Sequence, residues 1–293
     1  MKKLLPFLIL LGLLCGCAAQ GEPAQIAATT LPVYEFTTRL CQGTGITVTR
    51  LVNENVSCLH DYTIKVDQMQ AIEKAELIVI NGGDLETFLE DVLKDHDRIL
   101  DASTGMELLC PEEETDDHDH HDDHGHHHDV DPHLWLSPVR AAAMVKNICN
   151  GLIARYPEHQ EKLQTNLAAL LADLAALQSY AETELADLSC RELLTFHDGF
   201  AYLAESFGLT VLEAVEEESG SETSAAELIR LIHIVNEHQL PSIFTEVNGS
   251  PAAAGTIQAE TGVKVYALDT AMAGDSYFDA MYRNIDTLKE ALG

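Results

Sequence analysis

Residues 158–188 read EHQEKLQTNLAALLADLAALQSYAETELADL, and this run contains neither glycine nor proline. Leucines recur along it with the period of an α-helix, at positions 163, 167, 170, 171, 174 and 177. A helix of about 30 residues would be roughly 45 Å long, which exceeds the width of a small domain. We therefore expect a long, rigid connecting helix over residues 156–188, lying between two lobes.

Strand-like and helix-like segments alternate on both sides of this helix. Before it, short apolar or β-branched runs lie at 26–29, 45–52, 75–81 and 98–102. After it come RELLTF (191–196), LTVLEAV (209–215), SIFTEV (242–247) and VKVYALD (263–269). Amphipathic stretches separate the runs; one is 84–94, with Asp84 as its expected N-cap. This alternation predicts an α/β fold of two lobes, 18–155 and 189–293, each a mainly parallel sheet flanked by helices.

The N-terminus, MKKLLPFLILLGLLCGCAAQ, has the pattern of an export signal. Two lysines precede an apolar run over 4–14, which is shorter than the roughly 20 residues that span a bilayer. The following Leu-Cys-Gly-Cys resembles a bacterial lipobox, in which a cysteine after a small residue is lipidated. Cys17 follows Gly16 and fits, so we expect a signal over 1–17 and a lipid anchor at the extracytoplasmic face of the cell membrane. An ordinary cleaved signal is the alternative.

Charge and cysteine content narrow the possible partners. The chain has 48 acidic against 17 basic residues and a formal net charge of −31, which argues against nucleic acid and suits attraction of cations. The remaining cysteines, at 41, 58, 110, 149 and 190, show no C-x-x-C metal pattern, and their pairing cannot be deduced. No G-x-x-x-x-G-K-[ST] loop occurs, so this chain is not expected to use ATP.

An acidic, histidine-rich loop occupies residues 112–130. Its histidines are His118, His120, His121, His124, His126, His127 and His128. Such a segment has too little apolar content to bury itself, and it offers many weak, interchangeable metal sites. We interpret it as an accessory loop that collects or senses zinc, with a solvated linker as the alternative.

Four other side chains follow predicted strands, where open α/β sheets bind ligands. His60 follows the 45–52 run, His133 lies beyond the histidine-rich loop, and His197 and Asp269 come directly after later strands. Each lobe supplies two of them, so a cleft between the lobes could collect all four. Three imidazoles and one carboxylate suit Zn²⁺. A single histidine at such a place is more often structural, and we interpret His96, His159, His233 and His238 in that way.

Several motifs resemble those of the metal-binding lipoproteins of bacterial zinc and manganese ABC importers, the cluster A-I solute-binding proteins. DPHLWLSP (131–138) and LLTFHDGFAYLAESFGL (193–209) match two ligand motifs, in which His133 and His197 would coordinate metal. VYALD (265–269) matches the region of the fourth ligand, Asp269. INGGDLETFLE (80–90) and IFTEVNGSP (243–251) match framework segments. SCLHDY (57–62) lacks the family's usual Asp-Pro before the first ligand, His60.

The resemblance implies a monomeric, non-enzymatic receptor that captures Zn²⁺ and delivers it to an ABC permease in the membrane. Manganese members generally have glutamate where His197 stands, so this chain favours zinc, with Mn²⁺ as the lesser alternative. An exported zinc hydrolase is the alternative from another class, although the chain has no H-E-x-x-H and offers only Glu205 and Glu246 as a base. A surface zinc buffer or adhesin is a third possibility. The long helix predicts a modest closure of the cleft.

Overall fold

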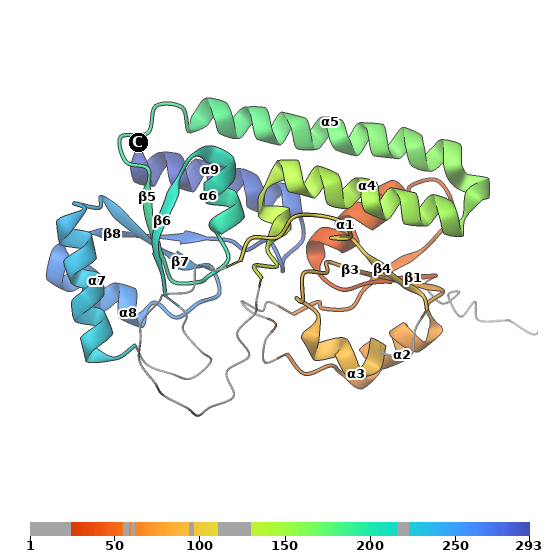
Figure 1. Ribbon diagram of the computed structural model, residues 1–293, viewed down its shortest axis with the longest axis horizontal. Helices are drawn as coiled ribbons and strands as arrows, with labels where there is room; N and C mark the ends of the chain where they lie inside the picture. Colours follow the sequence, from red (N-terminus) through yellow and green to blue (C-terminus); the bar gives the residue numbers. More distant parts are fainter. Residues whose placement is uncertain (1–24, 55–58, 60–61, 94–96, 111–129, 216–222) are drawn as a thin grey trace, which may run out of the picture.

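The computed structural model describes residues 25–54, 59, 62–93, 97–110, 130–215 and 223–293. It contains two four-stranded parallel sheets, one in each lobe, with helices packed around them (Figure 1). The predicted α/β class and the two-lobe architecture are confirmed. In the described part of the chain, no helix is long and apolar enough to cross a bilayer.

The N-terminal sheet has the strand order β2-β1-β3-β4. Its strands are β1 (Ile26–Ala28), β2 (Val48–Arg50), β3 (Leu77–Ile80) and β4 (Ile99–Asp101). Its helices are α1 (Leu31–Leu40), α2 (Val66–Lys74), the short α3 (Glu90–Leu93) and α4 (Pro138–Arg155). Helix α4 begins where the sequence predicts, because Ser137 accepts the amide hydrogen of Arg140 and Pro138 occupies the first turn.

The C-terminal sheet repeats this arrangement, with the order β6-β5-β7-β8. Its strands are β5 (Glu192–Thr195), β6 (Thr210–Ala214), β7 (Ser242–Glu246) and β8 (Lys264–Leu268). Its helices are α6 (Ala201–Phe207), α7 (Ala225–Glu237), α8 (Ala252–Thr261) and α9 (Tyr277–Leu292). In both sheets the order reverses between the first and third strands. Ligands of open α/β sheets generally bind at the carboxyl ends of the strands at such a point.

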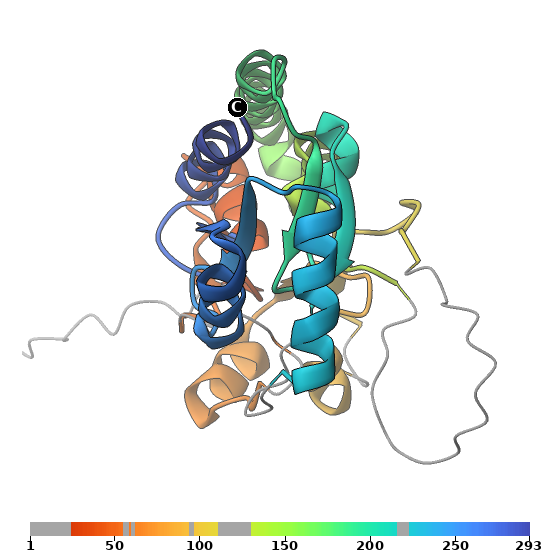
Figure 2. The ribbon, with the colours of Figure 1, turned by 90° about the vertical axis from the view of Figure 1, so that its left-hand side faces the viewer.

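The predicted connecting helix is α5 (Gln160–Glu184), preceded by the 3₁₀ turn η3 (Pro157–His159). It ends before residue 188 and buries Leu163, Leu170, Leu174, Leu177 and Ala181. Figures 1 and 2 show α5 along one edge of the molecule with α9 beside it, and it also packs against α1 and α4. One apolar cluster extends through this helix into both lobes and includes Phe36 and Tyr277. The lobes therefore share a core along α5.

The segment 84–94 differs from its prediction. Asp84 has φ +61°, whereas an N-cap residue is normally extended, so the expected cap at Asp84 is wrong. The helix begins later, as the 3₁₀ turn η1 (Thr87–Leu89) that leads into α3. The buried Glu86 carboxylate explains the turn, because it accepts the amide hydrogens of Asn81 (2.8 Å) and Gly82 (3.1 Å) and the Thr29 hydroxyl (2.6 Å).

Candidate metal centre

His133 lies buried at the start of the 3₁₀ turn η2 (Leu134–Leu136), which leads into α4. The Asp131 carboxylate holds it from behind: Oδ1 is 2.8 Å from the His133 backbone nitrogen and 2.8 Å from ring Nδ1. Because a carboxylate accepts hydrogen bonds, the neutral ring keeps its proton on Nδ1. The lone pair of Nε2 is then directed away from Asp131, where it can bind a cation.

His197 follows β5, and the pairing of β5 with β7 decides what lies beside it. Thr195 pairs with Phe244, so His197 and Glu246 each lie two residues beyond the same pair at one edge of the sheet. Glu246 Oε2 is 3.7 Å from His197 Nδ1, which is an ion-pair distance too long for a hydrogen bond. The sequence motifs placed Glu246 in a framework segment, and only the strand register shows that it neighbours a candidate ligand.

The two histidines, one from each lobe, meet face to edge. Their Nε2 atoms are 3.2 Å apart, and the ring planes cross at 89°. A tetrahedral Zn²⁺ with Zn–N bonds of about 2.0–2.1 Å holds two nitrogens about 3.3–3.4 Å apart. A β-carbon on Gly199 would lie 2.6 Å from His197 Cδ2 and 3.0 Å from His133 Cε1, so glycine is needed for this approach. The pair therefore already has the spacing of two zinc ligands.

Asp269 follows β8, but other groups occupy its carboxylate. Oδ1 accepts the Ala271 amide hydrogen at 2.8 Å, and Oδ2 is 3.2 Å from the Arg283 guanidinium. Among the described residues, no group of three or more His, Cys, Asp or Glu side chains is close enough to hold a metal. The structure thus brings His133 and His197 together and leaves Asp269 paired with Arg283.

Glu246 connects these two parts of the site. Thr270 donates its hydroxyl hydrogen to Glu246 Oε1 at 3.2 Å. Burial raises the pKa of Glu246 to about 8; the Thr270 hydroxyl opposes this rise and the charge of Asp269 adds to it. A nearly buried carboxyl group therefore lies between His197 and Asp269, and it holds a proton at neutral pH when no cation is near.

His60 lies outside the described residues, but both sides of its segment are fastened. The neighbouring Leu59 is buried, and its carbonyl accepts the Tyr62 amide hydrogen at 3.1 Å. The Tyr62 hydroxyl donates to Glu54 Oε2 at 2.6 Å, which joins the two ends of the segment. Cys17 and the seven histidines expected to form the accessory loop also lie outside the described residues.

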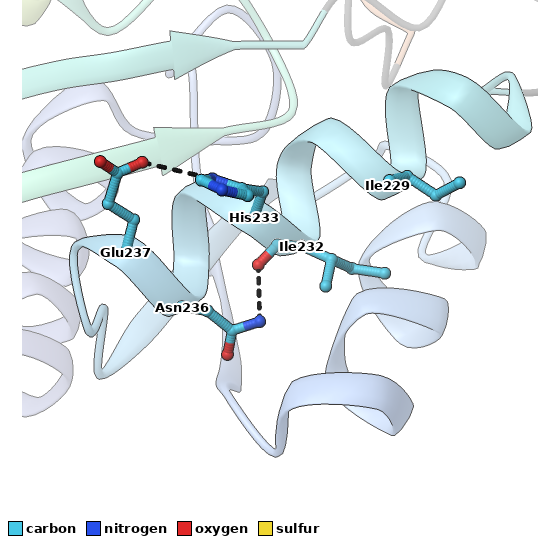
Figure 3. A pocket seen from close by; sticks show the side chains of 5 residues that line it. All are labelled: Ile229, Ile232, His233, Asn236 and Glu237. Carbon is cyan, nitrogen blue, oxygen red and sulfur yellow. Dashed lines mark hydrogen bonds and ion pairs between the residues drawn. The ribbon is translucent and has the colours of Figure 1, made fainter.

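The described histidines interpreted as structural have local carboxylate partners. His233 and Glu237 approach to 3.2 Å on α7 and point toward one another beside a shallow hollow lined by Ile229, Ile232 and Asn236 (Figure 3). His238 lies 3.1 Å from Glu192, and His159 lies 3.9 Å from Glu158. His96 falls outside the described residues.

The cysteines within the described part of the chain are free thiols, at 41, 110, 149 and 190. Burial, reinforced by Cys149, raises the pKa of Cys41 to about 12. Metal ligation requires the thiolate, so Cys41 is a poor ligand, as the sequence spacing indicated.

The family model described as "Zinc-uptake complex component A periplasmic" matches residues 26–291. The chain belongs to this family. The match spans both lobes and the connecting helix, and it confirms the family resemblance of the motifs. The family is described as part of an uptake complex and not as an enzyme, so the hydrolase alternative finds no support.

Named relatives of the zinc-uptake family agree with this assignment. The chain is 34% identical to zinc-binding lipoprotein AdcA of Streptococcus pneumoniae over 94% of its own length and 58% of AdcA. It is 32% identical to the high-affinity zinc uptake system protein ZnuA of Bacillus subtilis, over 94% of this chain and 89% of that protein. The structure of Zn(II)-bound S. pneumoniae AdcA superposes with a TM-score of 0.75 at 31% identity, over 91% of this chain and 57% of AdcA. The chain thus spans little more than half of AdcA.

Proposed function

We propose that this chain is the extracytoplasmic receptor of a zinc importer, which captures Zn²⁺ between its lobes and delivers it to an ABC permease. The observation that supports this best is the pair of Nε2 atoms 3.2 Å apart, one from each lobe. A cation bound by both would be held by the closed arrangement of the lobes. A movement that separates the two histidines would then favour release of the ion to a partner.

The chemistry of capture follows from the groups behind each ring. Without metal, one Nε2–H can donate to the other Nε2, and Zn²⁺ takes the place of that shared proton. Both rings then need a proton on Nδ1, which Asp131 accepts behind His133 and Glu246 can accept behind His197. Imidazole nitrogen suits Zn²⁺ better than the harder Mn²⁺, which prefers oxygen. We therefore propose zinc as the transported ion, with a manganese receptor as the alternative.

His60 and Asp269 complete the proposed ligand set. Asp269 must exchange its contact with Arg283 for the metal, because Oδ2 cannot face both. Arg283 is an exposed side chain on α9, so it can swing into solvent when a cation arrives. In the absence of metal, the Arg283 guanidinium thus neutralises the Asp269 carboxylate, and zinc can replace it.

Contacts between the lobes support a modest closure. The Trp135 indole donates to the Thr270 carbonyl at 2.7 Å, and the Tyr277 hydroxyl donates to the Trp135 carbonyl at 2.7 Å. Both bonds join the N-terminal lobe to the C-terminal lobe: one ends at Thr270, next to Asp269, and the other at Tyr277, the first residue of α9. Wide separation of the lobes would break these buried bonds and the core shared along α5.

The anchoring and delivery parts of the proposal rest on the sequence and the family. A signal over 1–17 with lipidated Cys17 would place a monomer at the outer face of the cell membrane, beside its permease; AdcA is itself named a lipoprotein. The seven histidines between 118 and 128 would act as an accessory zinc collector, and they are not proposed as high-affinity ligands.

A zinc titration against a competing chelator tests the proposal. The variants are the unchanged chain, a chain without residues 112–129, His197→Ala, and His233→Ala as the matched control on α7. We expect one tight zinc that survives loop deletion and His233→Ala but is lost with His197→Ala. Tight binding that vanishes with the loop and ignores His197 would move the site to the loop and refute the proposal.

A further inference from the structure

Tyr202 is a fully buried residue of α6 whose hydroxyl contacts the opposite lobe. The hydroxyl accepts the Leu109 amide hydrogen at 2.8 Å and donates to the Asp131 carbonyl at 3.0 Å. The Asp131 amide in turn donates to the Leu109 carbonyl at 2.8 Å. Leu109 and Asp131 are therefore paired like residues of two adjacent strands, with the Tyr202 hydroxyl inserted into the second bond of the pair.

These three hydrogen bonds lie between the histidine-rich segment and the candidate ligand His133. Leu109 and Asp131 flank the segment that contains the histidine-rich run, and they bring its two ends together. Asp131 is also the residue whose carboxylate holds both the backbone and the ring of His133. The three hydrogen bonds thus fix the main chain of Asp131 at its N–H and its C=O. The Asp131 side chain in turn fixes His133.

Other contacts fasten α6 to the N-terminal lobe independently of the Tyr202 hydroxyl. The Arg140 guanidinium lies 4.5 Å from the centre of the Tyr202 ring and pairs with Glu205 at 2.9 Å. One turn further along the α6 region, Ser206 donates to the Ser137 hydroxyl at 2.7 Å. Loss of the hydroxyl alone should therefore leave α6 in place and act locally, on Leu109 and Asp131.

We propose that Tyr202 is a positioning residue for zinc capture, whose hydroxyl holds Asp131, and through it His133, in ligand geometry by helping to close the segment between Leu109 and Asp131. This rests on the proposed function, in which His133 binds the metal. The physical reason is loop closure: holding together the ends of a long segment costs conformational entropy that grows with its length. The hydroxyl contributes two of the three hydrogen bonds that oppose this cost.

The test uses the full-length chain in detergent and compares Tyr202→Phe with Tyr156→Phe. Tyr156 is also buried, but it lies at the C-terminal end of α4, the end opposite to His133, and its hydroxyl contacts Glu76 at 3.4 Å. Zinc dissociation constants are measured by chelator competition. We expect Tyr202→Phe to weaken zinc binding about tenfold, since two hydrogen bonds are lost beside a ligand, and Tyr156→Phe to leave it unchanged.

A second background separates positioning from general stability. Residues 111–129 are replaced by a short hairpin connector, which holds Leu109 and Asp131 together covalently. In this background we expect the Tyr202→Phe effect to fall to about twofold or less, because the connector now supplies the closure. An equal tenfold loss in both backgrounds would overturn the proposal.

Cobalt substitution supplies a readout that a purely structural role would not change. Co²⁺ in the site reports its ligand geometry through its visible absorption, and we expect Tyr202→Phe, but not Tyr156→Phe, to alter that spectrum. Unchanged zinc affinity and an unchanged cobalt spectrum in Tyr202→Phe, with zinc still lost in His197→Ala, would refute the positioning role alone. Zinc binding that is insensitive to His197→Ala would refute the proposed function instead.

Discussion

Replacing Asp131 by asparagine should weaken zinc binding without removing the fold around His133. The amide oxygen can still accept from the His133 amide and from ring Nδ1, but it no longer bears a charge. Hydrogen bonds to an ionised acceptor are roughly twice as strong as neutral ones. The other carboxylate oxygen, Oδ2, is buried and has no hydrogen-bond partner among the described residues, so we expect the NH₂ group that replaces it to be buried without an acceptor.

The expected magnitude follows from these two losses. Removal of a carboxylate that orients a metal-bound histidine typically lowers metal affinity about 10–100-fold. That range corresponds to about 1.4–2.8 kcal/mol of binding free energy. The unpaired amide adds a destabilisation of the fold of about 1–3 kcal/mol. Asp131→Asn should therefore raise the zinc dissociation constant by one to two orders of magnitude and lower the melting temperature of the metal-free protein.

The chain offers a closely matched control in Asp101. Its Oδ1 accepts the amide hydrogen and the hydroxyl hydrogen of Ser103, each at 2.7 Å, so it repeats the bonding pattern of Asp131 with a residue that is no proposed ligand. Asp101→Asn should cost stability but leave the zinc dissociation constant unchanged in the chelator assay. Equal zinc affinity in Asp131→Asn and the unchanged chain would show that the carboxylate does not orient His133.

Three further outcomes are expected. With a pKa of about 8, Glu246 is protonated in the metal-free protein at pH 7, and zinc should expel that proton; Glu246→Gln should release about one proton fewer per zinc in calorimetry across buffers of different ionisation enthalpy, and an unchanged proton count would contradict this. Arg283→Gln should tighten zinc binding several-fold by freeing Asp269, because an ion pair with an exposed partner contributes up to about 1 kcal/mol that zinc would otherwise have to overcome. Unchanged affinity would argue against Asp269 as a ligand. Hydrogen bonds from Lys65, and to a lesser extent from Tyr62, lower the pKa of Glu54 to about 2. The stabilisation of the fold by these bonds is therefore complete above the ordinary pKa of 4.5 and is lost as the pH falls toward 2. Glu54→Gln should make the stability measured in urea less dependent on pH across that window, and an equal dependence would refute the assignment.

Local patterns in the sequence were sufficient to predict the class of fold. Ser137-Pro138 predicts the start of α4 because capping depends on adjacent residues, and the leucine period predicts α5 because a helix repeats along the chain itself. Alternating strand-like and helix-like segments predict parallel sheets because this alternation is also visible along the chain. Asp84 shows the limit: it has a positive φ, and the turn around it is held by the buried hydrogen bond from Thr29 to Glu86, two residues that are distant in sequence.

For the site, the sequence by itself offered four candidate metal ligands, and it showed that two of them, His197 and Asp269, directly follow predicted strands. Tertiary structure decided which of them meet. The 3.2 Å approach of His133 and His197 depends on how two lobes pack, and the place of Glu246 beside His197 depends on the register of β7 against β5. The three hydrogen bonds among Tyr202, Leu109 and Asp131 likewise join residues from three segments of the chain. A motif shows which chemical groups lie next to each other along the chain. Which distant segments come close together is decided only when apolar surfaces are buried and the strands take their order in the sheets.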